Sequence, residues 1–271
     1  MSDSKKRCKK VGFSTGALEL GNYRSALMWL SRHHFDSVEL SALRLWELPP
    51  LLRDLNNLNV SQFRYVSFHA PSWFEAADEF RVVKQLEVVY KRGWNIIVHP
   101  DVIRKPKLWT RFESQLLLEN MDRRKPTGRT ADELELLFSV LPAARLCLDV
   151  AHARHLDTTL TVLADLVMRF AGRIAEVHIS ELDSGCKHQP MSWCAVTDYQ
   201  NLSWRSLAAG VPVIIESMLN ESGTTLRQDE YFLACTASHR DLAAKHAAPA
   251  QSCAARINGH RAVRKRHSAH R

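Results

Sequence analysis

Short apolar runs recur along the chain, and longer segments with helical spacing separate them. Apolar positions three and four residues apart predict helices at Glu79–Lys91, Thr130–Val140 and Thr158–Phe170. Gly93, Gly172 and Gly210 each precede a predicted strand and are expected to end helices, and Thr130 with Glu133 predicts a capping box. The eight strand-like runs are Val11–Ser14, Ser37–Leu40, Tyr65–Phe68, Asn95–Val98, Gln115–Leu118, Arg145–Leu148, Ile174–Ile179 and Pro212–Ile215.

Eight strand–helix units in about 230 residues favour a single-domain (β/α)₈ TIM barrel of the α/β class, which typically takes about 250 residues. The alternative is an open, doubly wound sheet. That fold favours a glycine-rich phosphate loop after the first strand, and "FSTGALELG" lacks the GxGxxG spacing. The expected organisation is a basic extension at 1–10, the barrel at 11–236, and a basic, disordered tail at 237–271.

The net charge of +8 is concentrated at the two ends of the chain. Residues 237–271 contribute +7 and residues 1–10 contribute +4, which leaves −3 for residues 11–236. Basic ends can contact nucleic acid, or they can simply be solvated. The sequence contains neither an apolar run of the roughly 18 residues that span a bilayer nor the apolar core of a signal peptide. Six cysteines without CxxC pairing favour a reduced, cytoplasmic protein with no membrane partner.

Metal-binding residue types stand at the carboxyl ends of six of the eight predicted strands. In a barrel these ends meet at one mouth, where charges of one sign would be costly without a bound cation. Taken singly, Asp149 could cap the next helix and His99 could bond to backbone, but their joint placement predicts a site for a divalent metal such as Zn, Mn or Co. The candidate ligands are His69, His99, Glu119, Asp149, His152, His178, His188 and Glu216.

The order of these residues, with the Asp149-x-x-His152 motif, resembles the xylose isomerase-like TIM-barrel superfamily. That superfamily includes sugar isomerases and epimerases and the endonuclease IV class (AP endonuclease family 2). The likeness extends over about residues 10–220. In the epimerase branch, the resemblance implies one metal held by Glu119, Asp149, His178 and Glu216. Glu119 and Glu216 would then also be the catalytic acid and base.

The endonuclease branch implies up to three ions. His69 and His99 would join Glu119 on a second metal, and His152 would join an Asp-x-His pair on a third. Here the pair reads Cys186-Lys187-His188, so cysteine stands where the carboxylate is expected. We therefore expect one to three ions, and the role of Cys186 stays open.

Other residues are candidates for substrate binding. Trp73 could stack on a sugar ring or a base, or pack on the barrel rim. Arg123, Arg124 and, with less support, Lys187 could bind a phosphate or carboxylate, or belong to solvated loops. Glu39, at the end of the second strand, could be a mouth residue or a hydrogen-bonding group.

These patterns favour a metal-dependent isomerase or epimerase of a sugar or sugar phosphate, using Glu119 and Glu216. One alternative is an endonuclease IV-like phosphodiesterase acting on apurinic-site DNA, although a slightly acidic body is poorly suited to duplex DNA. Another is a non-catalytic metal-binding scaffold. A carbohydrate is the expected partner and nucleic acid the second choice, while the oligomeric state is not indicated.

Overall fold

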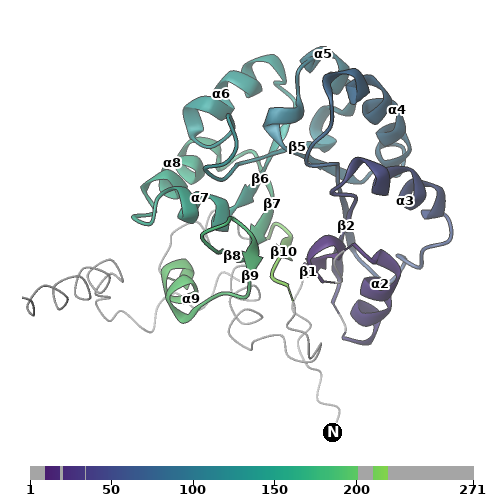
Figure 1. Cartoon of the computed structure of the whole chain (residues 1–271), viewed down its shortest axis with the longest axis horizontal. Helices are drawn as coiled ribbons and strands as arrows, with labels where there is room; N and C mark the ends of the chain where they lie inside the picture. Colours follow the sequence, from purple (N-terminus) through teal and green to yellow (C-terminus); the bar gives the residue numbers. More distant parts are fainter. Residues whose placement is uncertain (1–9, 19–20, 34, 201–209, 219–271) are drawn as a thin grey trace, which may run out of the picture. The chain divides into compact units, whose positions relative to one another are not determined.

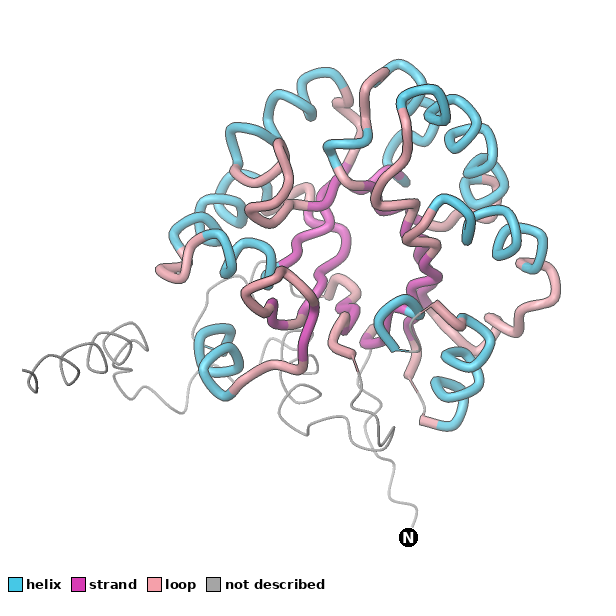
Figure 2. Tube along the Cα trace, viewed as in Figure 1, coloured by secondary structure: helices cyan, strands magenta, loops and turns pink. Residues whose placement is uncertain are grey.

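The chain folds into a closed barrel of eight parallel strands surrounded by helices (Figures 1 and 2). The computed structural model describes residues 10–18, 21–33, 35–200 and 210–218. The strand order around the barrel is β1-β10-β7-β6-β5-β4-β3-β2. This closure confirms the predicted (β/α)₈ barrel and excludes the open sheet. The barrel strands are β1 Val11–Ser14, β2 Ser37–Ser41, β3 Tyr65–His69, β4 Asn95–Val98, β5 Leu116–Glu119, β6 Arg145–Asp149, β7 Ile174–Ile179 and β10 Val213–Ile215.

Helices cover the outside of the barrel because one face of each strand and one stripe of each helix are apolar. In α4, for example, Val82, Val83, Leu86 and Val89 are fully buried against the sheet. The helices are α1 Thr15–Leu18, α2 Tyr23–Arg32, α3 Leu48–Asp54, α4 Glu79–Tyr90, α5 Pro106–Trp109, α6 Ala131–Val140, α7 Val150–Leu156, α8 Thr161–Phe170 and α9 Trp193–Gln200. Short 3₁₀ turns lie at Leu45–Glu47, Ala76–Asp78, Pro100–Val102 and Thr110–Gln115, and a small antiparallel hairpin is formed by β8 Glu181–Leu182 and β9 His188–Gln189.

Alternation along the strands divides the buried side chains into two sets. One set joins the large apolar core between sheet and helices, and the other faces the barrel interior. A small cluster of Ile97, Leu117, Cys147 and Ala175 forms separately from the large core. The chemistry-bearing side chains at the strand ends continue this alternation. The apolar pattern therefore determines which strand-end residues face inward.

Each predicted strand overlaps an observed one, and β1, β4 and β7 have the predicted bounds, whereas the ends of the others differ. Strands β2, β3, β5 and β6 run one residue further than predicted, so that His69, Glu119 and Asp149 are themselves strand residues. The predicted helix from Thr158 begins only at Thr161. The Asp157 carboxylate accepts bonds from the backbone amides that follow it, and it forms a turn in place of a first helical turn.

The predicted helix signals are only partly as expected. Thr130 caps α6, since its hydroxyl accepts from the Glu133 amide at 3.3 Å. The Glu133 carboxylate does not complete the capping box, because it binds the Arg129 amide at 2.7 Å. Gly93 follows α4 with φ +73°, whereas Gly172 is outside the left-handed region.

Part of the predicted organisation lies outside the described residues. This holds for nearly all of the N-terminal extension, which was predicted at 1–10, and for the whole tail at 237–271. Their boundaries remain predictions. Among the helices of the described residues, none is long and apolar enough to cross a membrane.

Candidate metal centre at the barrel mouth

The strand ends bring the predicted ligands together in a buried ring. His69, Glu119, Asp149, His178 and Glu216 are each at most 7% exposed. They come from β3, β5, β6, β7 and the residue after β10, so closure of the barrel, rather than any local motif, places them side by side. The ligand atoms of these and neighbouring side chains form four groups among the described residues, each compact enough for one ion. Three of them overlap at the strand ends, and the fourth, Cys147, Glu176 and His178, shares His178 with them.

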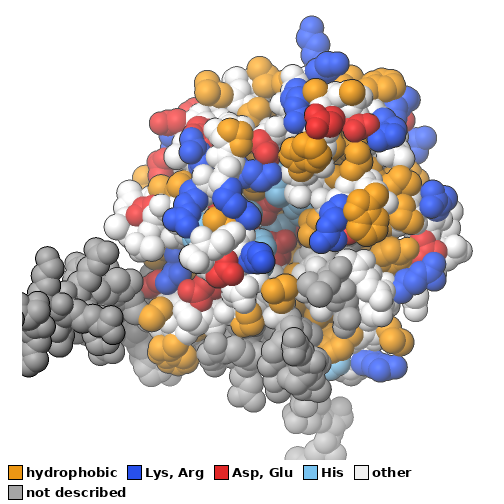
Figure 3. Space-filling view, viewed as in Figure 1, with side chains coloured by type: hydrophobic (Ala, Val, Ile, Leu, Met, Phe, Trp, Pro, Cys, Tyr) orange, Lys and Arg blue, Asp and Glu red, His pale blue; other side chains and the backbone are white. Residues whose placement is uncertain are grey.

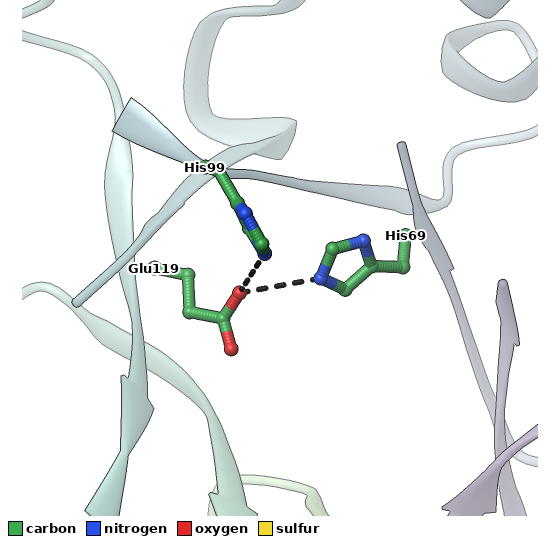
Figure 4. A group of neighbouring side chains, drawn as sticks. All are labelled: His69, His99 and Glu119. Atoms are coloured by element: carbon green, nitrogen blue, oxygen red, sulfur yellow. Dashed lines mark hydrogen bonds and ion pairs between the residues drawn. The ribbon is translucent and has the colours of Figure 1, made fainter. Parts of the chain in front are cut away.

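The first group consists of His69, His99 and Glu119 (Figure 4). Both imidazoles direct Nε2 at the same carboxylate oxygen, with Glu119 Oε2 at 3.2 Å from His69 and 3.1 Å from His99. The Nδ1 atom of His69 bonds the backbone oxygen of Ala70 at 2.7 Å, which fixes the ring and leaves Nε2 for the cluster. This is the geometry of two nitrogen ligands and one oxygen ligand around a shared point.

The second group consists of Glu119, Asp149, His178 and Glu216, whose ligand atoms all lie within 4.8 Å of one another. Here the other oxygen of Glu119, Oε1, lies 3.1 Å from His178 Nδ1. The two oxygens of one carboxylate thus face two different groups. A carboxylate in this position can bridge two cations.

The third group consists of Asp149, His152 and His188. His152 donates through Nδ1 to the backbone oxygen of Asn120 at 2.8 Å, which leaves its Nε2 for the cluster. Asp149 Oδ1 accepts from the His152 amide at 2.7 Å and so caps α7, while Oδ2 lacks a hydrogen-bond partner in the described part of the chain. The helix-cap interpretation of Asp149 therefore holds for Oδ1, while Oδ2 is left for the cluster.

Two pKa shifts indicate that protons help to balance the charge of the ring. Burial and the charges of Glu216 and Glu119 raise the pKa of Asp149 well above its usual value. Burial lowers the pKa of His69, but the hydrogen bond to Glu119 and the nearby carboxylates outweigh it and raise the pKa to about 9. Asp149 Oδ2 and Glu216 Oε2 are buried without hydrogen-bond partners among the described residues. A divalent cation fits this donor set, because it would replace the retained protons and satisfy both oxygens.

Asn120 is a supporting residue that was not singled out from the sequence. It is fully buried, and its amide bonds both the backbone nitrogen and the backbone oxygen of Asp149 at 2.8 Å. These two bonds lock the ends of β5 and β6 together. The only sequence signal was its position directly after Glu119.

The third group departs from a complete metal site where the sequence does. Cys186 Sγ lies 3.6 Å from His155 Nδ1, and Cys186 belongs to none of the ligand groups found in the described residues. A different carboxylate, Asp122, lies with Oδ2 3.9 Å from His152 Nε2. Asp122 holds Arg124 through bonds of 2.7 Å and 3.0 Å. Burial raises the pKa of Asp122, but the bonds from Arg124 outweigh burial and lower it to about 2.

A cavity of about 460 Å³ lies over the ring. In the space-filling view, histidine and acidic side chains lie at the bottom of a hollow and basic side chains surround its rim (Figure 3). Arg44, which was not singled out from the sequence, is among the residues that line the cavity. The cavity is lined by Ser14, Gly16, Ala17, Gly21, Leu43, Arg44, Glu47, His69, Ser72, His99, Glu119, Asp122, Arg124, His152, Lys187, His188, Glu216 and Met218.

The structure separates the predicted substrate-binding residues into two pairs. Arg124 and Lys187 line the cavity. Trp73 is 60% exposed and is not among the residues that line the cavity. Arg123 also lies outside the cavity lining and donates to the backbone oxygen of Ser184 at 2.9 Å.

Similar folds are found among solved structures. A xylose isomerase-like TIM barrel protein from Mycobacterium smegmatis, in complex with magnesium, is 10% identical, with 80% of this chain and 88% of that chain covered and a TM-score of 0.55. A Sinorhizobium meliloti 1021 protein is 11% identical over 85% of this chain and 97% of that chain, with a TM-score of 0.56. Endonuclease IV from Thermus thermophilus is 15% identical over 82% of this chain and 95% of that chain, with a TM-score of 0.49.

These likenesses are structural only. No protein-family model matches the sequence, and no curated protein matches it either. At identities this low, the shared feature is the path of the chain, including the barrel that presents the strand ends. The chain therefore shares its (β/α)₈ barrel fold with these structures, one of which is a xylose isomerase-like TIM barrel protein, and the eight strand–helix units of the sequence predicted this fold.

Proposed function

We propose that this protein is a phosphoester hydrolase that binds two divalent metal ions at the barrel mouth. The observation that carries the proposal is the division of Glu119, whose Oε2 faces His69 and His99 while Oε1 faces His178. A carboxylate shared in this way supports a two-metal centre. Phosphoester hydrolysis is a reaction class in which two neighbouring ions are commonly used.

The residues divide into two sets of ligands. One ion would be held by His69, His99 and Glu119, and the other by Glu119, Asp149, His178 and Glu216. Imidazole and carboxylate donors suit zinc, manganese or cobalt, with magnesium a further choice for the carboxylate-rich set. When bound, such ions supply an activated water and stabilise negative charge on the phosphoryl oxygens.

The side chains of the cavity complete the chemistry. Arg124 is pre-oriented by Asp122 and can bind a phosphoryl oxygen through the guanidinium atoms that Asp122 does not use. Lys187 lines the same cavity and can place a second positive charge near the substrate. The burial of the ring limits bulk water around the reacting atoms, which strengthens these charge interactions.

Sugar isomerisation or epimerisation is the second candidate, and Glu216 favours it. Its Oε2 lies at the cavity without a hydrogen-bond partner among the described residues, so it could accept a proton from a substrate carbon. The sequence hypothesis also required Glu119 as an acid or base. Both oxygens of Glu119 already face imidazoles, which leaves this pair incomplete and favours hydrolysis.

The first experiment is a metal count on the purified protein, followed by assays with the same preparation. We expect two ions per chain and turnover of p-nitrophenyl phosphate or its bis ester. An abasic-site oligonucleotide tests the nuclease alternative, and deuterium uptake from solvent into a panel of ketoses tests the epimerase. Glu75→Gln, an exposed substitution, is the matched control for Glu216→Gln.

The outcomes separate the hypotheses. One ion with deuterium uptake and no phosphoester turnover would replace the hydrolase by an epimerase. Two bound ions with no turnover of any substrate would favour the non-catalytic scaffold. The cytoplasmic location and a role for the basic ends remain predictions from the sequence.

A further inference from the structure

A second group of polar side chains lies inside the barrel, beneath the candidate metal centre. Its central member is Glu176, which precedes His178 by two residues on β7 and is fully buried. Burying a carboxylate in a barrel interior is costly unless it is hydrogen-bonded and partnered. The contacts of Glu176 should therefore reveal what it does.

Glu176 is held from across the barrel by β3. The Tyr65 hydroxyl donates to Oε2 of Glu176, and the Ser67 hydroxyl donates to Oε1 at 3.1 Å. Asn95 on β4 in turn donates to the Tyr65 hydroxyl at 2.8 Å. These bonds fix the carboxylate in one orientation. Oε1 of Glu176 then lies 3.0 Å from His178 Nε2.

His178 is consequently held between two sets of carboxylates. Its Nδ1 faces the cluster, at 3.1 Å from Glu119 Oε1 and 3.5 Å from Glu216 Oε2. Its Nε2 faces Glu176 and also lies 3.2 Å from Glu39 Oε2. An imidazole whose Nε2–H donates to a carboxylate presents Nδ1 as its free electron pair.

We propose that Glu176 is a positioning residue that holds the Nε2 proton of His178 and thereby makes Nδ1 the metal-binding atom of this histidine. Glu39 assists from β2, where its other oxygen accepts from the Ser41 hydroxyl at 3.1 Å. Carboxylates that bond a metal-binding histidine in this way fix its tautomer and raise its affinity for the ion. The inference rests on the metal centre of the proposed function and not on the reaction assigned to it.

The surroundings of Glu176 favour this role over a purely structural one. The interior also contains Ile97 and Leu117, and apolar residues of this kind could fill the space without burying a charge. The hydrogen bonds that Tyr65 and Ser67 donate to Glu176 join side chains only, so the backbone pairing of the strands does not depend on them. The arrangement therefore has its end point in His178.

The test is metal affinity, measured by competition with a chelator and independently of turnover. Glu176→Gln preserves the shape of the side chain and removes its charge. We expect this substitution to lower the affinity for one of the two ions by about 10- to 100-fold. With cobalt as the probe, the visible absorption of the same ion should shift, because the His178 ligand changes orientation. Glu176→Asp keeps the charge and should fall between wild type and Glu176→Gln.

Two controls make the outcome decisive. Tyr65→Phe removes a bond to Glu176 but leaves the contact with His178, so its metal affinity should remain within about threefold of wild type. Glu75→Gln should have no effect. A metal affinity and cobalt spectrum of Glu176→Gln equal to those of Glu75→Gln would overturn the inference. Two tightly bound ions without phosphoester turnover would count against the hydrolase alone, while the affinity comparison would still decide the role of Glu176.

Discussion

The first and third ligand groups lie on two flanks of the second group, and they differ in how well they suit a cation. The first flank is the group with His69 and His99, and the second flank is the group with His152 and His188. On the first flank, His69 and His99 direct nitrogen atoms at one oxygen of Glu119. On the second, Cys186 turns to His155, and the nearby carboxylate of Asp122 is occupied by Arg124. The carboxylate of the first flank is thus partnered by imidazoles, which can exchange a proton for a metal ion, whereas the carboxylate of the second is partnered by a permanently charged guanidinium. Strand-end histidines can therefore stand in place for an ion while the carboxylate beside them is paired with a guanidinium instead.

The largest expected effect is that of Glu119→Gln. The side chain belongs to both the first and the second ligand groups, so its loss weakens metal binding at two sites together. We expect no more than one ion per chain and a loss of turnover on the order of 1000-fold. Metal analysis after dialysis, with Glu75→Gln as the control, measures the first quantity. Two ions retained in Glu119→Gln would contradict the shared carboxylate.

The comparison between flanks is tested by a pair of histidine variants. His69→Ala should cost one of the two ions and about 100-fold in turnover, because it removes a nitrogen ligand from the complete flank. His188→Ala should leave two ions in place, since one oxygen of Asp149, the carboxylate of its group, already caps α7 and the nearby Asp122 is held by Arg124. Metal analysis at matched protein concentration gives the number of ions per chain in both variants. Loss of an ion from His188→Ala would show that the second flank binds metal after all.

Arg124→Ala should sharpen the comparison from the other side. It removes a cation from the cavity, so KM for a phosphoester should rise about tenfold, the lower range for a hydrogen bond to a charged group. It also releases Asp122, so a third, weaker ion should appear in a metal titration. Arg123→Ala is the matched control because Arg123 lies outside the cavity lining. An unchanged KM together with no additional ion would show that Arg124 neither binds the phosphoester nor keeps a metal ion away from Asp122.

The change expected from a single pH unit, with no residue substituted, is no larger than any of these. Without metal, the pKa of His69 is about 9, so the imidazole is protonated at neutral pH. Binding of the ion must expel this proton, and the affinity of the first flank should therefore rise with pH up to about 9. We expect about tenfold per pH unit for one displaced proton. Calorimetry in buffers of different ionisation enthalpy measures the proton released, and a pH-independent affinity would contradict the assignment.

The sequence predicts the barrel and its ring for the same reason. Buried parallel strands are recognisable as short apolar runs, and polar residues at their ends stand out against them. Glu176 lacks this contrast, because it lies within a strand and gains its meaning only when closure brings β3 across from β7. Asp122 was equally hidden, since a carboxylate in a basic loop looks solvated until the loop folds onto His152. Local patterns therefore predict which residues face the mouth, but not which of them neutralise one another.

The cap on α7 links local unfolding to the metal centre. Because one oxygen of Asp149 starts this helix and the other faces the cluster, an ion that fixes the carboxylate also fixes the first turn of the helix. Any opening of α7 that swings Asp149 away must release the ion, so the free energy of opening increases with metal concentration. Amide hydrogens of Val150–Leu156 should then exchange with solvent more slowly as more of the centre is occupied by metal, so that hydrogen exchange in this helix reports the metal occupancy.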